Sequence, residues 1–415
     1  MLYSDFSLEK NCTEFSGINI YNAVNDFGTP LILYSEKRIR ENVKRIINAF
    51  MPYNISIHFA MKANYNPYIL NLLKSLGCGI DAANQNEAML ALKLGFNNND
   101  VVSTPNNLDR EGLAFLINNG IKINYDHLGQ YKLVQDLNPE FVSFRINPGI
   151  GMGEFKEITT AGENVKFGIS YDEALKSYKY ARDHGAKRFG IHMMTGSNVL
   201  SAKFFKESSR LFFNIAANIS KKLDISFDYL DLGGGFGVPY RDNDPDFDIK
   251  AAAGYILENF ENFNGIFNNS DLIIEPGRYI IADSAVLISR ITSIKNYGHT
   301  IIGTDVSMNT LIRIPLYGAY HKIYIAGKCS DDKLISADIV GQACENTDYI
   351  ARNIKIPSVN DGDIVIISNA GAYIMSMASN YNLLARPAEA IILDGNLRLI
   401  KKRESVDDML KTFYP

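Results

Sequence analysis

The 415-residue sequence has few cysteines, no long run of lysine or arginine, and no apolar segment long enough to span a bilayer. Its 42 basic and 46 acidic residues give a net charge of −4, which argues against nucleic acid or an anionic membrane as the main partner. The first ten residues also lack the basic start and apolar middle of a signal peptide. Because a spanning helix needs roughly 20 apolar residues, we expect a globular protein with no membrane segment.

The four cysteines, Cys12, Cys78, Cys329 and Cys344, are scattered along the chain without the short spacing of a metal-binding motif. We therefore expect no metal site and no disulfide framework. This use of cysteine favours a cytoplasmic, thiol-reduced setting.

From about residue 30, short apolar runs alternate with segments whose apolar residues recur at helical spacing. This alternation predicts parallel strands joined by crossover helices. Eight candidate strands within about 250 residues favour a TIM-type (β/α)8 barrel over an open, doubly wound sheet. The candidate strands are residues 55–60, 79–82, 101–103, 121–124, 141–146, 188–192, 227–232 and 271–275.

After about residue 284 the pattern changes, because β-rich segments follow one another with few helical stretches between them. We predict an α/β protein with a barrel at 30–284 and a second, mainly β domain at 285–415, completed by residues 1–29. The β-rich segments are 285–294, 299–303, 322–326, 363–367 and 390–394.

Lys62 stands just past the first candidate barrel strand, in the segment 58–64. In a barrel this strand end faces the catalytic mouth. A lysine placed there can lose its charge by desolvation, which suits a Schiff base with an aldehyde cofactor. The short segment taken alone is more typical of a surface lysine after a strand.

Two further strand ends carry groups that suit a phosphorylated cofactor. Residues 231–237 hold four glycines in five positions, which lets the backbone approach an anion closely, although a tight turn is the alternative. Glu275 and Arg278 end the last candidate strand. The carboxylate could keep a ring nitrogen protonated and the guanidinium could bind phosphate or carboxylate, or the two could form a structural ion pair.

Two polar segments of the β-rich region are weaker candidates. Cys344 beside Glu345 could donate a proton if it is exposed, whereas a buried, inert cysteine is the commoner case. Tyr373 lies near the segment 379–382, and its hydroxyl could bind phosphate, but it is one of 23 tyrosines.

Taken together, these segments resemble the fold-type III pyridoxal 5′-phosphate (PLP) decarboxylases, in particular the meso-diaminopimelate decarboxylase family. The resemblance runs over nearly the whole chain and preserves the order of the family's motifs. They are FAMKAN (59–64), RINPG (145–149), GENVKFGI (162–169), GIHMMTGS (190–197), DLGGGFGVPY (231–240), EPGR (275–278), MNTLIRIPLYGAYH (308–321), GQACENTD (341–348), GAYIMSMASNYN (371–382) and RPAE (386–389).

The resemblance implies a role for each matched residue. Lys62 would carry the cofactor, and Cys344 would protonate the product carbon after carbon dioxide leaves. The family's cofactor contacts correspond to Met194, Ser197, Gly233, Gly234, Gly235, Glu275, Gly277, Arg278 and Tyr373. Its substrate contacts correspond to Arg278, Arg313, Tyr317, Glu345 and Tyr373, with Glu345 meeting the distal amine. In the family, the residues that correspond to Cys344 and Glu345 enter the active site from the second subunit. The resemblance therefore implies a homodimer with shared active sites.

Several positions depart from the family pattern. Met194 stands where a histidine usually stacks on the cofactor ring, and His192 matches the earlier histidine of the usual pair. Asn84–Glu87 replaces Ser-Gly-Gly-Glu, Asn346 and Thr347 replace Ser-Gly, and Ile374 replaces a glycine. We expect PLP-dependent decarboxylation of meso-diaminopimelate to L-lysine. A related diamino acid, a non-catalytic PLP-binding relative and a PLP racemase are the alternatives.

Overall fold

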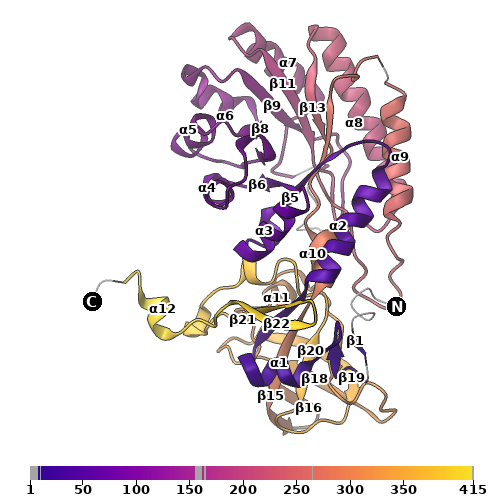
Figure 1. The fold of residues 1–415 in the computed structure, drawn as a ribbon, viewed down its shortest axis with the longest axis vertical. Helices are drawn as coiled ribbons and strands as arrows, with labels where there is room; N and C mark the ends of the chain where they lie inside the picture. The colour runs from indigo at the N-terminus through magenta and orange to yellow at the C-terminus, as the bar shows by residue number, and fades with distance from the viewer. Residues whose placement is uncertain (1–7, 10, 155–160, 163–164, 264, 414–415) are drawn as a thin grey trace. The chain divides into compact units, whose positions relative to one another are not determined.

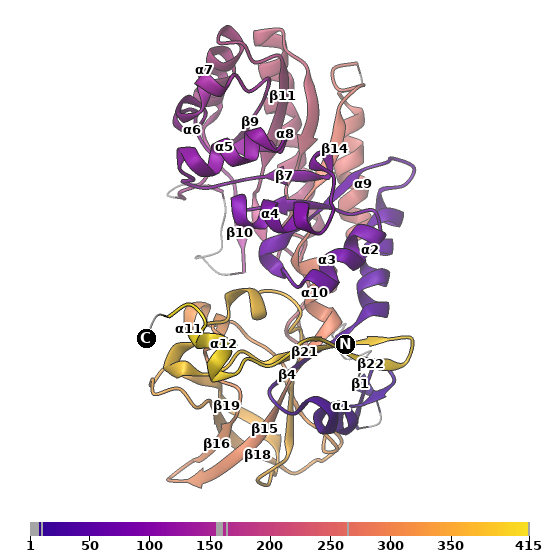
Figure 2. The same ribbon diagram turned by 60° about the vertical axis from the view of Figure 1, so that its left-hand side comes forward.

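The computed structural model describes residues 8–9, 11–154, 161–162, 165–263 and 265–413. Glu163 and Asn164 of the GENVKFGI segment lie outside these residues. The described chain forms two compact units that alternate along the sequence (Figures 1 and 2). The barrel unit contains residues 43–237 and 246–279, and the β unit contains the described residues of 1–42, 238–245 and 280–415.

The barrel unit is a closed barrel of eight parallel strands, so the predicted TIM-type barrel is confirmed. The last strand pairs with the first, with Ile274 opposite Ile57, and this pairing closes the ring. Most strand residues are buried, as expected where helices cover the outside and side chains fill the inside. The strands are β5 (Ser56–Ala60), β6 (Gly79–Ala82), β7 (Val101–Ser103), β8 (Lys122–Tyr125), β9 (Phe141–Ile146), β11 (Arg188–Met193), β13 (Phe227–Asp231) and β14 (Asp271–Ile274).

The barrel helices begin at residues that cap them. The Asn66 side chain accepts a hydrogen bond from the Tyr68 amide, with Pro67 as the first helical residue, and Ser170 and Glu173 form a reciprocal capping box. Helices α8 and α9 lie side by side (Figure 1). The ring centroids of Phe213 on α8 and Phe260 on α9 are 5.6 Å apart. The helices are α3 (Pro67–Ser75), α4 (Gln85–Lys93), α5 (Arg110–Asn118), α6 (Leu128–Leu133), α7 (Tyr171–Asp183), α8 (Ala202–Leu223) and α9 (Ile249–Glu261).

The β unit is built on a nine-stranded sheet. Strand β4 lies inside it, antiparallel to β15 and parallel to β21. The predicted barrel bounds of 30–284 include β4, yet all five of its residues are buried in this other sheet. The strands are β4 (Leu31–Ser35), β15 (Ala285–Asn296), β16 (Thr300–Thr304), β17 (Ile323–Ile325), β18 (Leu334–Val340), β19 (Tyr349–Pro357), β20 (Ile364–Ile367), β21 (Ala388–Leu393) and β22 (Asn396–Lys401).

The N-terminal segment packs with the β unit. Its short strands, β1 (Leu8–Glu9), β2 (Glu14–Phe15) and β3 (Ile18–Asn19), form a small sheet that leads into α1 (Ile20–Phe27). Phe15 and Ile20 are fully buried and belong to the same core cluster as Val286 and Ile366. None of the helices in the described part of the chain has the length and apolar character that crossing a membrane requires.

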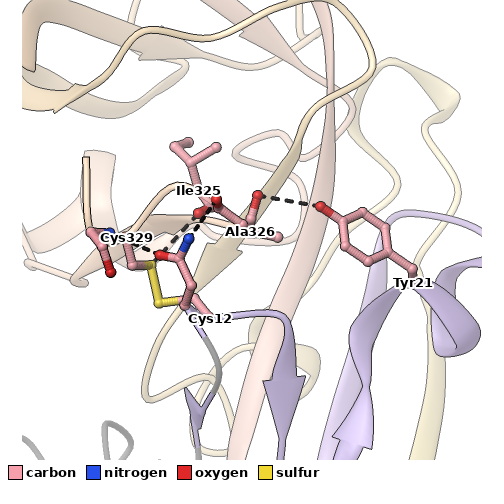
Figure 3. The surroundings of a disulfide bond; sticks show 8 residues. Cys12, Tyr21, Ile325, Ala326 and Cys329 are labelled. Atoms are coloured by element: carbon pink, nitrogen blue, oxygen red, sulfur yellow. Dashed lines mark hydrogen bonds between the residues drawn. A yellow bond between two sulfur atoms is a disulfide. The ribbon is translucent and has the colours of Figure 1, made fainter. Parts of the chain in front are cut away.

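A disulfide joins Cys12 to Cys329 across 317 residues (Figure 3). Beside it, the Tyr21 hydroxyl donates to the Ala326 carbonyl at 3.3 Å, and the Gly327 amide donates to the Asn11 carbonyl at 3.0 Å. The expectation of reduced thiols is therefore wrong for this pair. Spacing along the sequence carries no information about a contact formed by packing two distant segments. Cys78 and Cys344 are free thiols.

Replacing both Cys12 and Cys329 by serine should lower the melting temperature under non-reducing conditions. The bond restricts the unfolded chain, and a native disulfide contributes about 2–4 kcal/mol. Scanning calorimetry would measure the loss. Reductant should lower the melting temperature of the wild type and leave that of the double variant unchanged. Equal melting temperatures for the wild type and the variant without reductant would contradict the assignment.

Candidate active site

Lys62 lies in a single 3-10 turn, Met61–Ala63, directly after β5. Its side chain is 43% exposed, while its Nζ lies 3.0 Å from Oδ2 of Asp81, whose side chain is only 1% exposed. Burial and the nearby Glu275 raise the pKa of Asp81, whereas Lys62 lowers it. The lysine predicted to hold the cofactor is thus placed at a barrel strand end and paired with a buried carboxyl group.

Three buried groups gather at the neighbouring strand ends. His192 is on β11, Asp231 ends β13, and Glu275 follows β14; each offers an atom within 4.8 Å of the others. The His192 Nε2 lies 3.3 Å from Glu275 Oε2. Burial by itself raises the pKa of Glu275, but His192 and Lys62 outweigh burial and lower it to about 2. Glu275 is therefore ionised at neutral pH.

The glycines at 233–235 are required by close contact between backbone segments. A Cβ on Gly234 would lie 2.2 Å from the Glu275 carbonyl oxygen, and one on Gly233 would lie 2.4 Å from that of Met193. Gly233 and Gly235 also have φ values of +65° and +95°. The close contacts and the positive φ values account for glycine at these positions, as the tight-turn alternative expects.

Met194 contacts this glycine loop directly. The Gly234 amide donates to the Met194 Sδ at 3.1 Å. The thioether is a weak acceptor, so it holds the loop less firmly than a nitrogen or oxygen acceptor would. Ser197, in the short strand β12 (Gly196–Ser197), is half-buried two residues before Val199, whose amide donates to the Gly235 carbonyl at 2.9 Å.

The segment after β14 carries the last three residues of the barrel unit that were predicted to contact the cofactor. The Glu275 amide donates to the Gly233 carbonyl at 2.7 Å, and the Ala60 amide donates to the Pro276 carbonyl at 3.4 Å. Gly277 precedes Arg278, which begins α10 (Arg278–Ile281) and is 7% exposed. These bonds join the glycine loop, the end of β5 and the predicted phosphate-binding arginine into one backbone framework.

These residues fit pyridoxal phosphate. Glu275 is an ionised, buried carboxylate that faces His192 Nε2 through Oε2, and its Oε1 has no hydrogen-bond partner among the described residues, so lone pairs remain for a ring N–H. The glycines place no side chain of their own against a phosphate, although the Gly233 and Gly234 amides already donate to Asp231 and Met194, and Lys62 supplies the amine.

Arg313 and Tyr317 lie in the β unit, on α11 (Arg313–Tyr317). Arg313 is 1% exposed; its Nη1 lies 2.8 Å from His321 Nε2 and 3.4 Å from the Tyr240 hydroxyl. Because the Arg313 guanidinium can only donate, His321 Nε2 must accept, and its Nδ1–H donates to the Ser368 carbonyl at 2.8 Å. His321 therefore holds Arg313 as a neutral imidazole.

Cys344, Glu345 and Tyr373 also belong to the β unit. Cys344 and Glu345 are exposed on the segment between β18 and β19, so the buried-cysteine alternative does not apply. The Cys344 amide donates to Asn382 Oδ1 at 2.6 Å. Tyr373 is half-buried and has a φ of +58°.

The sequence-based prediction missed Asp81 and Asp231 beside the barrel candidates, and in the β unit it missed His321 beside Arg313. The first two lie at carboxyl ends of barrel strands, the same signal that singled out Glu275. His321 gave no such signal, because its contact with Arg313 depends on a turn of α11.

One departure from the family pattern has a local structural explanation. Asn84 caps α4, its side chain accepting from the Asn86 and Glu87 amides at 2.9 and 3.2 Å. Glu87 accepts in return from the Ala83 amide at 2.7 Å. The altered segment thus serves as a helix cap and keeps its glutamate.

Comparison with known proteins gives matches over the whole chain. The family described as "Pyridoxal-dependent decarboxylase, pyridoxal binding domain" matches residues 36–282. A diaminopimelate decarboxylase of Thermoplasma acidophilum is 37% identical over 405 residues, covering 97% of this chain and 98% of that protein. One of Methanothermobacter thermautotrophicus is 35% identical over 401 residues, covering 95% and 94%. The crystal structure of diaminopimelate decarboxylase from M. jannaschii in complex with L-lysine is similar with a TM-score of 0.91 and 28% identity, covering 100% of this chain and 99% of that one.

Lys62→Ala should prevent covalent attachment of pyridoxal phosphate, because the site then lacks its amine. Borohydride reduction followed by peptide mass spectrometry would locate the attached cofactor in the wild type. Lys44→Ala, which removes an exposed lysine of helix α2 (Glu36–Phe50), is the matched control and should retain the label at Lys62. Full labelling of another lysine in Lys62→Ala would refute the assignment.

Proposed function

The chain belongs to the pyridoxal-dependent decarboxylases, and from this premise we propose that it converts meso-diaminopimelate to L-lysine and carbon dioxide. The observation that carries the proposal is the Lys62 amine at a strand end of the same barrel that buries the ionised Glu275. An amine and an anionic partner for a ring nitrogen are what an amino-acid decarboxylase with this cofactor requires. The substrate in this proposal is taken from the similar proteins, which are named diaminopimelate decarboxylase.

Pyridoxal phosphate, when bound, supplies a ring that accepts the electrons released as carbon dioxide leaves. In our proposal Lys62 carries the cofactor. The residues that hold the cofactor are Met194, Ser197, Gly233, Gly234, Gly235, Glu275, Gly277, Arg278 and Tyr373. Glu275 keeps a proton on the ring nitrogen, because its carboxylate remains ionised within a buried site. Met194 packs its sulfur against the ring face in place of a histidine.

For substrate recognition we assign the carboxylate and the distal amine of diaminopimelate to different side chains. Arg278, Arg313, Tyr317 and Tyr373 bind carboxylate, and the neutral His321 supports this by fixing the guanidinium of Arg313. Glu345 binds the distal amine. Cys344 gives its proton to the carbon that loses carbon dioxide, and its exposure leaves the thiol accessible for that transfer.

We also propose a homodimer in which Cys344 and Glu345 act in the partner's site. Their exposure on one segment of the β unit is compatible with reaching a second subunit. The cytoplasm is the proposed compartment, because a reducing medium keeps Cys344 as the thiol that this role requires. The Cys12–Cys329 bond, in which Cys12 is buried and Cys329 is exposed, is the exception to this expectation of reduced thiols.

Carbon dioxide release from a panel of amino acids would test the substrate. We expect release from meso-diaminopimelate and little from lysine, ornithine or arginine, because only diaminopimelate has both a distal amine and a distal carboxylate. Release from another member alone would point to a related diamino acid and identify the changes at Met194, Asn346 and Thr347 as specificity changes. No release, with no cofactor bound, would indicate a non-catalytic relative.

Co-expression of Lys62→Ala with Cys344→Ala would test the shared site. Each variant should be inactive alone, whereas a mixed dimer has one site with both native residues. Random pairing should thus restore about a quarter of the wild-type turnover. The control is co-expression of the Lys62→Ala variant with a double variant that carries both Lys62→Ala and Cys344→Ala. This pair leaves no complete site. Inactive mixed dimers, isolated by two affinity tags, would exclude the arrangement.

A further inference from the structure

We propose that Asp231 is a positioning residue of the cofactor site, which stays protonated and donates a hydrogen bond to Glu275. The inference rests on the cofactor that the family shows and is independent of which amino acid is the substrate. Asp231 is 0% exposed at the end of β13, and one of its oxygens lies within 4.8 Å of a Glu275 oxygen.

The hydrogen-bond pattern leaves two carboxyl oxygens in this cluster without a donor. Asp231 Oδ1 accepts from the Gly233 amide at 2.9 Å, and Glu275 Oε2 faces His192 Nε2 at 3.3 Å. Asp231 Oδ2 and Glu275 Oε1 are both buried and have no partner among the described residues. A buried oxygen without a partner is costly. One proton on Asp231 Oδ2, shared with Glu275, satisfies both oxygens.

The surrounding charges place that proton on Asp231. Lys62 pairs with Asp81, so its charge is already balanced at 3.0 Å. His192 faces Glu275, and both His192 and Lys62 lower the pKa of Glu275, which favours its ionised form. Burial raises the pKa of Asp231 well above its usual value, and Glu275 and Asp81 raise it further.

The remaining titratable groups around the cluster come from strands β5, β9 and β13 of the barrel. His58 on β5 and Arg145 on β9 interact with Glu275, and Tyr229 on β13 interacts with Asp231. Burial lowers the pKa of His58 and raises that of Tyr229, so both side chains are neutral. Arg145 is the one further cation in this set, and its charge is shared with Asp126, Glu275 and Asp81.

The protonated Asp231 connects two parts of the site. One of its oxygens fixes the glycine loop through the Gly233 amide, and the other fixes the carboxylate that would hold the cofactor's ring nitrogen. Asparagine has the same shape and an amide that can make both bonds without a charge. It therefore mimics the protonated residue, whereas alanine removes both bonds.

Infrared difference spectra of the apoprotein at neutral pH, wild type minus Asp231→Asn, would test the protonation state. We expect the carbonyl stretch of a protonated carboxylic acid in the wild type and its loss in the variant. Asp228→Asn is the matched control: Asp228 is on the same strand and pairs with Arg188 at 2.6 Å, so its removal should change only carboxylate bands. A carboxylate band lost in Asp231→Asn would overturn the proposal.

Titration of the same apoproteins with pyridoxal phosphate would test the positioning role. Asp231→Asn should bind within about threefold of the wild type, and Asp231→Ala should bind at least about tenfold more weakly, because Glu275 loses a donor in the buried site. Equal weakening in both variants would also overturn the proposal. If Asp231→Ala fails to fold, the infrared comparison and the affinity of Asp231→Asn still decide it.

Discussion

The site depends on the burial of three carboxyl groups, Asp81, Asp231 and Glu275, at one end of the barrel. Charged groups removed from water persist only when cations or hydrogen-bond donors compensate them. Lys62 compensates Asp81, and His192 compensates Glu275. The third carboxyl group has no cation of its own, and so the state of Asp231 follows from the other two pairs. This balance gives Glu275 the ionised form that a pyridine nitrogen requires.

The glycine loop adds a steric constraint to this electrostatic one. Its backbone lies so close to the carbonyl groups of Met193 and Glu275 that a methyl group would collide with them. The loop, the end of β11 and the segment after β14 are therefore fixed together. Any shift of the loop would also move Glu275, whose amide donates to the Gly233 carbonyl. The glycine loop and the ring-nitrogen candidate Glu275 are thus joined by direct backbone contacts within the barrel unit.

Sequence periodicity predicted the barrel because each strand there, apart from the closing pair of β14 with β5, pairs with the next barrel strand along the chain. The same approach could not place β4, since its partners β15 and β21 lie hundreds of residues away. The Cys12–Cys329 bond was missed for the same reason. Among site residues, Lys62 and Glu275 stood out by their positions after strands. Asp231 was hidden inside a glycine motif that drew attention to its backbone, and His321 matters only through its contact with Arg313.

The position of β4 also has a consequence for the order in which the protein can form during synthesis. The ribosome makes this strand before any strand of the barrel, yet it pairs with residues 285–288 and 388–392. All eight barrel strands have been synthesised at a stage when β4 still lacks both of its partner strands, β15 and β21. An apolar, β-prone segment that waits for distant partners is prone to aggregate, and such non-local pairing slows folding. Chains truncated before β21 would therefore leave one edge of β4 without its partner strand, and an unpaired apolar edge favours pairing with another chain.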